Sequence, residues 1–351
     1  MYEQLGLQIE PRTASILLGL LIGLAFGAMA EVSRFCFRRA VAGPASERKS
    51  AAGVWLAGLA AAVIGTQLAI AQGLISFDEH RFMAADLPWL AIIAGGLLFG
   101  AGMVLTRGCV SRLTVLAGSG NLRAALVILT FATVAHASLK GILAPIRTTL
   151  GAATVPLETA ALPQVSAWII AAAAALAAWR FADSRRNLLL GALIGLLVPA
   201  AWVGTGYVLF DEFDPIALES LSFTSPAADT LFWTVASTSI PARFGTGLLG
   251  GVLLGAFALA LLSGRFQWQS FESPRQTGRY LAGAALMGVG GVLAGGCTVG
   301  AGLAGVPTLS IAATLALLSI AAGGALTARL IRDGGASTAA GQAKPSLQPA
   351  E

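Results

Sequence analysis

Long apolar runs alternate with short polar connections along almost the whole chain. Each run consists mainly of Leu, Ile, Val, Ala, Phe and Gly and holds few charged residues. Runs of about 20 such residues match an α-helix that crosses the roughly 30 Å hydrocarbon core of a bilayer. The pattern therefore predicts nine membrane-spanning helices, at residues 14–30, 51–72, 88–106, 121–144, 163–181, 187–204, 244–264, 279–296 and 308–331.

The composition agrees with this pattern. Hydrophobic residues make up 56% of the chain and charged residues only 11%, whereas a soluble domain carries about 25% charged residues. The apolar runs leave no stretch that would form a separate soluble domain. The sequence therefore predicts an all-α polytopic membrane protein, followed by a disordered tail at residues 333–351 that is rich in Gly, Ala, Gln and Pro.

The charges in the connections predict how the chain is oriented. The 22 basic and 17 acidic residues give a net charge of +5, which in a membrane protein indicates basic cytoplasmic loops rather than nucleic-acid binding. The odd-numbered connections are basic, as in the first with Arg38 and Arg39, whereas the second and sixth are mainly acidic. The positive-inside rule then places the N-terminus outside and the C-terminus inside the cell. Lys140 and Arg147, at the outer end of the fourth run, are exceptions.

The two halves of the chain share a sequence pattern. A shift of 188 residues superimposes Gly95 on Gly283, Gly100 on Gly288, Gly102 on Gly290, Gly108 on Gly296 and Cys109 on Cys297. The first four spans, in residues 1–150, therefore correspond to the last four, in residues 187–332, with a linking span in residues 151–186. Because a single span separates the halves, this 4+1+4 arrangement inverts the second half, as in many transporters. The mate of Cys36 is then Gly204, so the symmetry is imperfect.

The only three cysteines of the chain follow glycine-rich apolar runs at one common spacing. Cys36, Cys109 and Cys297 each lie nine positions after a glycine. The segments that follow Cys109 and Cys297 are too short to cross the membrane, which predicts re-entrant or broken helices. Non-helical backbone at membrane depth is tolerated where it is buried in protein or lines a cavity. Two such segments that enter from opposite faces are expected to meet at a central constriction.

The chemistry of these residues favours a soft anion as the ligand. A thiol is a weak hydrogen-bond donor with a polarisable sulfur, which suits a sulfur or selenium compound or a soft metal such as Cu(I). Nearby arginines and glycine-loop amides add positive potential and favour an anion. Thiosulfate fits, because its oxygens suit amides and hydroxyls and its terminal sulfur suits thiols. The candidate substrate-binding residues are Cys36, Cys109, Cys297, Arg34, Arg107, Gly108, Arg112, Gly296 and Thr298.

Other functions compete with this one. Buried cysteines and glycine faces also serve as plain packing surfaces between membrane helices. A membrane sulfurtransferase would form a cysteine persulfide, and Arg107 beside Cys109 is compatible with a thiolate nucleophile. A soft-metal permease is disfavoured because the chain lacks Met-rich motifs. The sequence shows neither a phosphate-binding loop nor zinc-ligand spacing, so we expect no ATP coupling and no cofactor.

The segments TRGCVSRLTVLAGSGNLRAAL and LAGGCTVGAGLAG resemble the signature regions of YeeE/YedE-type sulfur transporters, and the resemblance covers nearly the whole chain. It implies a bacterial inner-membrane protein associated with thiosulfate uptake. It also implies an hourglass-shaped helical fold with an inverted repeat, and the three cysteines along its central path. A small sulfur-carrier protein of the TusA type is the implied cytoplasmic partner. Members of the family differ in substrate, so another sulfur or selenium species stays open as an alternative.

Overall fold

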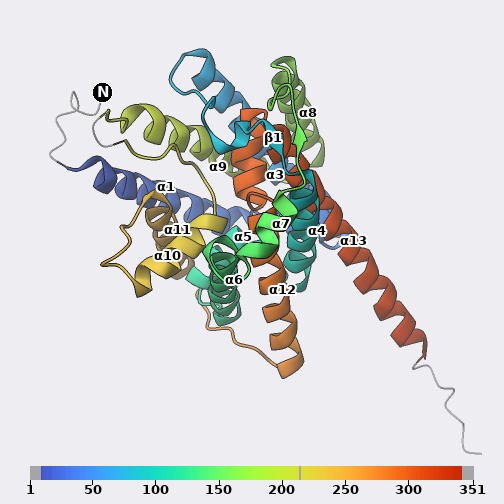
Figure 1. Ribbon diagram of the computed structural model, residues 1–351. Coiled ribbons are helices and arrows are strands. Elements are labelled where there is room, and N and C mark those ends of the chain that lie inside the picture. The colour runs from blue at the N-terminus through green and yellow to red at the C-terminus, as the bar shows by residue number, and fades with distance from the viewer. Residues whose placement is uncertain (1–8, 213–214, 342–351) are drawn as a thin grey trace, which may run out of the picture.

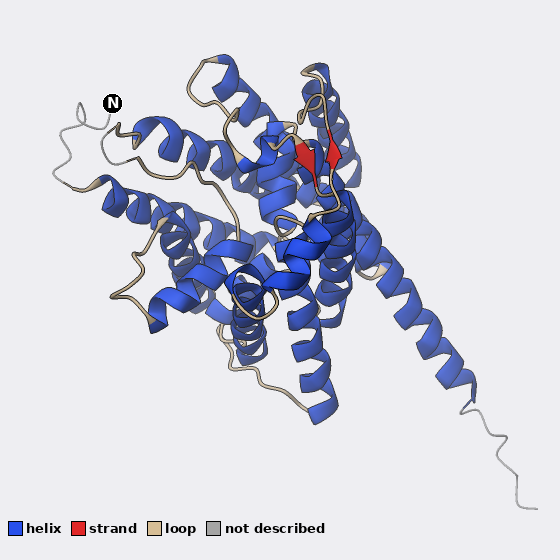
Figure 2. Cartoon of the chain, in the orientation of Figure 1, coloured by secondary structure: helices blue, strands red, loops and turns tan. Residues whose placement is uncertain are grey.

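The computed structural model describes residues 9–212 and 215–341, with side chains described as far as residue 332. Helices form most of it, and the strands make one small two-stranded sheet (Figure 2). Nine long helices coincide with the nine predicted runs, and most of their ends are shifted by a few residues, with larger shifts at the start of the second helix and the end of the ninth. They are α1 (Pro11–Ser33), α3 (Ala45–Ala71), α4 (Trp89–Leu105), α6 (Leu122–Lys140), α8 (Val165–Phe181), α9 (Arg185–Val203), α11 (Phe244–Leu262), α12 (Pro274–Leu293) and α13 (Ile311–Gly341).

Eight helical stretches in the described residues are long and apolar enough to cross a membrane, and α8 is a shorter apolar helix of 17 residues. The shorter helices are α2 (Phe37–Ala42), α5 (Val110–Gly118), α7 (Ala144–Gly151), α10 (Thr224–Val235), the 3-10 turns η2 (Arg81–Met83) and η5 (Val306–Thr308), and the π-helical η3 (Gly204–Val208) and η4 (Thr298–Gly305). Strand β1 (Asp86–Leu87) pairs antiparallel with β2 (Val155–Pro156), with Asp86 opposite Pro156.

The long helices pack against one another through glycine faces. Helix α1 lies along α11, and α3 lies along α9, while α4 packs against both α12 and α13 (Figure 1). Gly27 of α1 lies against the backbone of α11 at Val252, and Gly195 of α9 lies against the backbone of α3 at Gly58. Because a glycine has no side chain, the two backbones approach closely, as is common between membrane helices.

Helices α4 and α12 cross through two glycine contacts. Gly95 lies against Gly290, and Gly102 lies against Gly283. A methyl group at any of these four positions would come within 3.0 Å of an atom of the opposite helix, closer than real side chains pack. This contact joins the two helices that lead into Cys109 and Cys297.

Helices α1, α4 and α12 end in the same way. In each, a residue with a left-handed backbone lies two positions before a cysteine: Arg34 (φ 52°), Arg107 (φ 60°) or Gly295 (φ 73°). A left-handed residue is a common helix terminator. The cysteine then has an extended backbone and begins the next short helix, which is α2, α5 or η4. The chain thus contains the helix breaks predicted beside the cysteines, whereas at Gly204 the helix α9 continues into η3 without a break.

Helix α13 continues beyond Asp333, where the sequence predicted that a disordered tail begins, and ends at Gly341. Once a helix is formed, each further residue adds one backbone hydrogen bond, so a packed helix extends easily into a polar segment. The disordered tail stays a prediction. Residues 342–351, the remainder of the predicted tail, lie outside the described residues.

Candidate functional site

The three cysteines are buried and lie near one another. The exposed fractions of Cys36, Cys109 and Cys297 are 3%, 1% and 0%, and all three are free thiols. Cys109 lies between the other two. Its side chain is close enough to both Cys36 and Cys297 to interact with them electrostatically. The fold thus brings together three residues that are far apart in the sequence.

Polar groups surround two of the thiols. The amide of Gly300 donates to Cys297 Sγ at 3.4 Å, and Ser111 Oγ lies 3.3 Å from Cys109 Sγ. The hydroxyl of Thr298 lies beside Cys109 and is buried without a hydrogen-bond partner in the described part of the chain. Because the N-terminus of a helix carries a positive partial charge, the starts of α5 and η4 make this region favourable for an anion.

Gly108 and Gly296, the residues directly before two of the cysteines, keep the turns compact. A Cβ at Gly296 would lie 2.9 Å from the backbone nitrogen of Ala301, and one at Gly108 would lie 3.1 Å from the side chain of Leu113. The two predicted glycines therefore allow η4 and α5 to fold back closely onto the residues that precede the cysteines.

The predicted arginines do not gather around the thiols. Arg112 forms a mostly buried ion pair with Glu31 at 3.3 Å and donates to the carbonyl of Ala30 at 3.1 Å. These contacts tie α5 to α1. Arg34 and Arg107 are exposed, and their clearest structural feature is the left-handed backbone that ends a helix.

A basic hollow of about 560 Å³ lies next to the break at Cys36. Its charged lining residues are Glu31, Arg34, Arg39, Glu47, Arg112 and Arg265. The two glutamates pair with Arg112 and Arg39. Arg34 and Arg265 form no ion pair with the described residues, so this basic hollow keeps an excess of positive charge.

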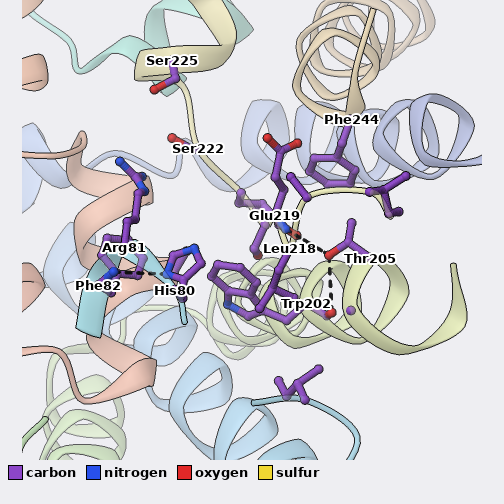
Figure 3. A pocket seen from close by; sticks show the side chains of 18 of the residues that line it. His80, Arg81, Phe82, Trp202, Thr205, Leu218, Glu219, Ser222, Ser225 and Phe244 are labelled. Atoms are coloured by element: carbon purple, nitrogen blue, oxygen red, sulfur yellow. Dashed lines mark hydrogen bonds between the residues drawn. The ribbon is translucent and has the colours of Figure 1, made fainter. Parts of the chain in front are cut away.

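A larger hollow of about 630 Å³, which we call the vestibule, lies where the second and sixth connections meet (Figure 3). Its ionisable and hydroxyl-bearing lining residues are Ser76, Glu79, His80, Arg81, Thr205, Glu219, Ser220, Ser222 and Ser225. Gly300 and Ala304 of η4 also line it, so the vestibule reaches the helix that begins after Cys297. Sequence reasoning missed the vestibule, because its walls come from two distant connections. The one available signal was Arg81, the single arginine of an otherwise acidic connection.

Burial changes the charge states in the vestibule. It lowers the pKa of His80 to about 4, with a further contribution from Arg81, so this imidazole is neutral at pH 7. Burial also lowers the pKa of Arg81, an effect that Glu219 opposes, and an arginine remains charged at pH 7. The pKa of Glu219 is raised by burial and by the neighbouring charge of Asp229, against the opposing influence of Arg243 and Arg81. The vestibule therefore combines a fixed cation with a carboxyl group that takes up a proton more readily than usual.

Comparison with known proteins connects this geometry to a family. The sequence model of the family described as "Sulphur transport" matches residues 32–190 and, a second time, residues 180–326. The chain belongs to this family. The curated relatives include "Thiosulfate transporter TsuA" of Spirochaeta thermophila, which is 25% identical over 329 residues that cover 85% of this chain and 93% of that protein. The protein of the same name in Escherichia coli K12 is 27% identical over 272 residues, which cover 68% of this chain and 72% of that protein.

Membership of the Sulphur transport family confirms the resemblance on which the sequence analysis relied. The protein is a multi-pass membrane protein of a transport family rather than an enzyme. Within the described residues, no three or more His, Cys, Asp and Glu side chains are grouped so that they could hold a metal ion.

Proposed function

We propose that this protein imports thiosulfate, or a closely related sulfur-containing anion, along a path lined by its three cysteines. The observation that carries the proposal is the buried group of three free thiols at helix breaks, in a chain of the Sulphur transport family. The names of the curated relatives support thiosulfate as the substrate. Its terminal sulfur is soft and suits the thiols, while its oxygens accept hydrogen bonds from amides and hydroxyls.

The order of the groups supports a path from the vestibule to the basic hollow. The vestibule reaches Gly300, whose amide donates to Cys297. Cys109 follows, and Cys36 lies beyond it, two residues from Arg34 in the wall of the basic hollow. Each thiol would hold the anion briefly and pass it to the next, since conduction needs several weak sites in series.

Two observations support the inverted repeat of residues 1–150 and 187–332 around the linking span at 151–186. The family model matches the chain twice, with one match in each half. The shift of 188 residues also converts one glycine contact between α4 and α12 into the other. Gly95 maps onto Gly283 and Gly290 corresponds to Gly102, so the two contacts are equivalent. A pseudo-two-fold axis through the α4–α12 contact explains this equivalence.

An orientation with the N-terminus in the periplasm and the C-terminus in the cytoplasm of a bacterial inner membrane follows from the charges. Acidic connections form the vestibule and basic connections form the basic hollow, which the positive-inside rule assigns to the outer and inner faces. The basic hollow is then the inner exit. Its unpaired Arg34 and Arg265 would favour the approach of a TusA-type carrier protein that receives the imported sulfur.

Growth on thiosulfate as the sole sulfur source tests the proposed function. A bacterial strain that lacks its own sulfate and thiosulfate uptake systems should grow when it produces this protein and should not grow with an empty vector. Absence of growth, with the protein present in the membrane, would count against thiosulfate. Growth on another sulfur or selenium anion under the same conditions would assign that anion instead.

A further inference from the structure

Arg81 is placed to hold an anion inside the vestibule. It is the only arginine or lysine among the described residues that line this hollow. Its guanidinium carbon lies 5.0 Å from the centroid of the Phe82 ring, and the described residues offer it no ion pair. Because the walls of the hollow exclude part of the water, an unpaired cation there attracts an anion more strongly than it would at an open surface.

The turn that carries Arg81 is held in place by its neighbours. His80 Nδ1 accepts a hydrogen bond from the Phe82 amide at 3.3 Å and caps η2. The Phe82 carbonyl accepts one from Ser310 Oγ at 2.8 Å, and the Phe82 ring is buried. A cation on such an anchored turn needs little rearrangement when it binds a ligand, which favours affinity.

Two serine hydroxyls line the same hollow as Arg81, and the chain between them passes close to Cys297. Ser222 and Ser225 line the vestibule, and Figure 3 shows Ser222 on the side toward which the Arg81 side chain points. Neither hydroxyl forms a hydrogen bond with any described residue. The backbone of Phe223, between them, lies close to Cys297, and Arg81 is also close enough to Cys297 to interact with it electrostatically.

We propose that Arg81, Ser222 and Ser225 form an outer binding site for the oxygen-bearing end of a tetrahedral sulfur oxyanion. Thiosulfate bound there directs its terminal sulfur toward Cys297, so the outer site captures and orients the substrate before the thiols receive it. This inference rests on the proposed function and adds a step that the thiols do not perform. The carboxyl group of Glu219 shares the same space (Figure 3), and its repulsion keeps the site weak enough to release the anion.

The outer site recognises oxygens rather than the terminal sulfur, which leads to a distinctive consequence. Sulfate has the same tetrahedral arrangement of oxygens but lacks the soft terminal atom. Sulfate should therefore occupy the outer site and compete with thiosulfate, without passing the thiols.

Arg81→Gln tests the outer site, and Lys140→Gln is the matched control. Lys140 is an exposed cation that does not line the vestibule. The measurement is the initial rate of radiolabelled thiosulfate uptake into proteoliposomes, at several thiosulfate concentrations and with and without sulfate. Arg81→Gln should raise both the KM for thiosulfate and the inhibition constant for sulfate by about 10- to 100-fold, the value of a lost charged hydrogen bond. The control should change both by less than about two-fold.

An unchanged KM and unchanged sulfate inhibition in Arg81→Gln would overturn the outer site. If this variant does not yield folded protein on gel filtration, the double variant Ser222→Ala/Ser225→Ala provides the same test, with an expected rise in KM of about 10-fold. No uptake of thiosulfate by the wild-type protein would refute the proposed function. Wild-type uptake together with unaffected variants would refute the outer site alone.

Discussion

The cysteine side chains are as buried as the alanines of the surrounding core, so burial alone does not separate a substrate ligand from a packing residue. Their surroundings make the distinction. Cys297 accepts from the Gly300 amide, and Cys109 lies beside the unpartnered hydroxyl of Thr298. A buried hydroxyl without a partner is costly, and a transported oxyanion would supply that partner. These contacts favour a role in binding.

Substitution of Cys109 separates the two roles. Cys109→Ala should lower the rate of thiosulfate uptake in cells by about 10-fold or more, because a lost hydrogen bond to a charged ligand costs about 1.5–3 kcal/mol. Cys109→Ser keeps a donor but loses the soft sulfur, so it should fail almost as severely. Membrane levels of both variants, measured by immunoblot, should stay normal. Wild-type uptake in Cys109→Ala and Cys297→Ala alike would leave the thiols with a packing role.

Glu219 should make binding depend on pH. Its pKa is raised by burial, so it is protonated at higher pH than an ordinary glutamate. A neutral Glu219 does not repel an anion at Arg81, and thiosulfate affinity should therefore rise as the pH falls through this raised pKa. His80 has a pKa of about 4, so it stays uncharged as the pH falls toward about 5 and does not contribute to this dependence.

Calorimetric titration of the purified protein with thiosulfate between about pH 5 and pH 8 measures this dependence. Glu219→Gln should bind thiosulfate with little change across the range. Glu158→Gln is the control, because Glu158 is an exposed glutamate that does not line the vestibule. The same pH dependence in Glu219→Gln as in the wild type would show that another group titrates.

At the scale of elements, the sequence located the helices well and the breaks between them only in part. The apolar runs end close to the ends of α1, α4 and α12, because a helix that crosses the bilayer requires an apolar run of matching length. The left-handed backbone at Arg34 and Arg107 was not predictable, since that conformation favours glycine and costs a residue with a side chain about 1–2 kcal/mol. Tertiary packing overrides this local preference. At the equivalent place before Cys297, the left-handed residue is Gly295, as the local preference for glycine would predict.

The break before Cys297 should depend on Gly295. Its φ is 73° and a Cβ there would touch nothing within 4 Å, so Gly295→Ala isolates the backbone cost. This variant should lose about 1–2 kcal/mol of stability. Gly278 of α12 also has open space around it but has no left-handed backbone, and Gly278→Ala should be neutral or stabilising by up to about 1 kcal/mol. Thermal unfolding in detergent measures both, and equal midpoints would contradict this explanation.

The whole molecule has a different opening at each end of the proposed path. Cys36 follows a helix break beside the basic hollow, whereas its predicted mate Gly204 begins η3 and adjoins Thr205 and Gly206 in the wall of the vestibule. The sequence predicted that Cys36 and Gly204 are symmetry mates, but it did not predict the vestibule. Hollows arise where connections far apart in the sequence meet, and such meetings leave no local pattern. The sequence thus indicated the thiols, and only the structure indicated Arg81 and its neighbours.

The orientation of the whole chain is directly testable. With the N-terminus outside and the C-terminus inside, a fluorescent reporter fused after residue 351 should fold in the cytoplasm, and a periplasm-dependent alkaline phosphatase fused there should be inactive. Phosphatase fused in the acidic connection after α3 should be active. The reverse result for both fusions would exchange the proposed entrance and exit.

The central claim is that the thiols carry thiosulfate across the membrane without keeping its sulfur. The most direct test is uptake of radiolabelled thiosulfate by sealed proteoliposomes that contain only this protein, followed by intact-mass measurement of the protein. The account predicts saturable uptake by the wild type, uptake that is slower by about 10-fold or more in Cys109→Ala, and an unchanged wild-type mass with all three thiols free. No uptake, together with a stoichiometric gain of one sulfur on the protein, would contradict it and favour persulfide formation.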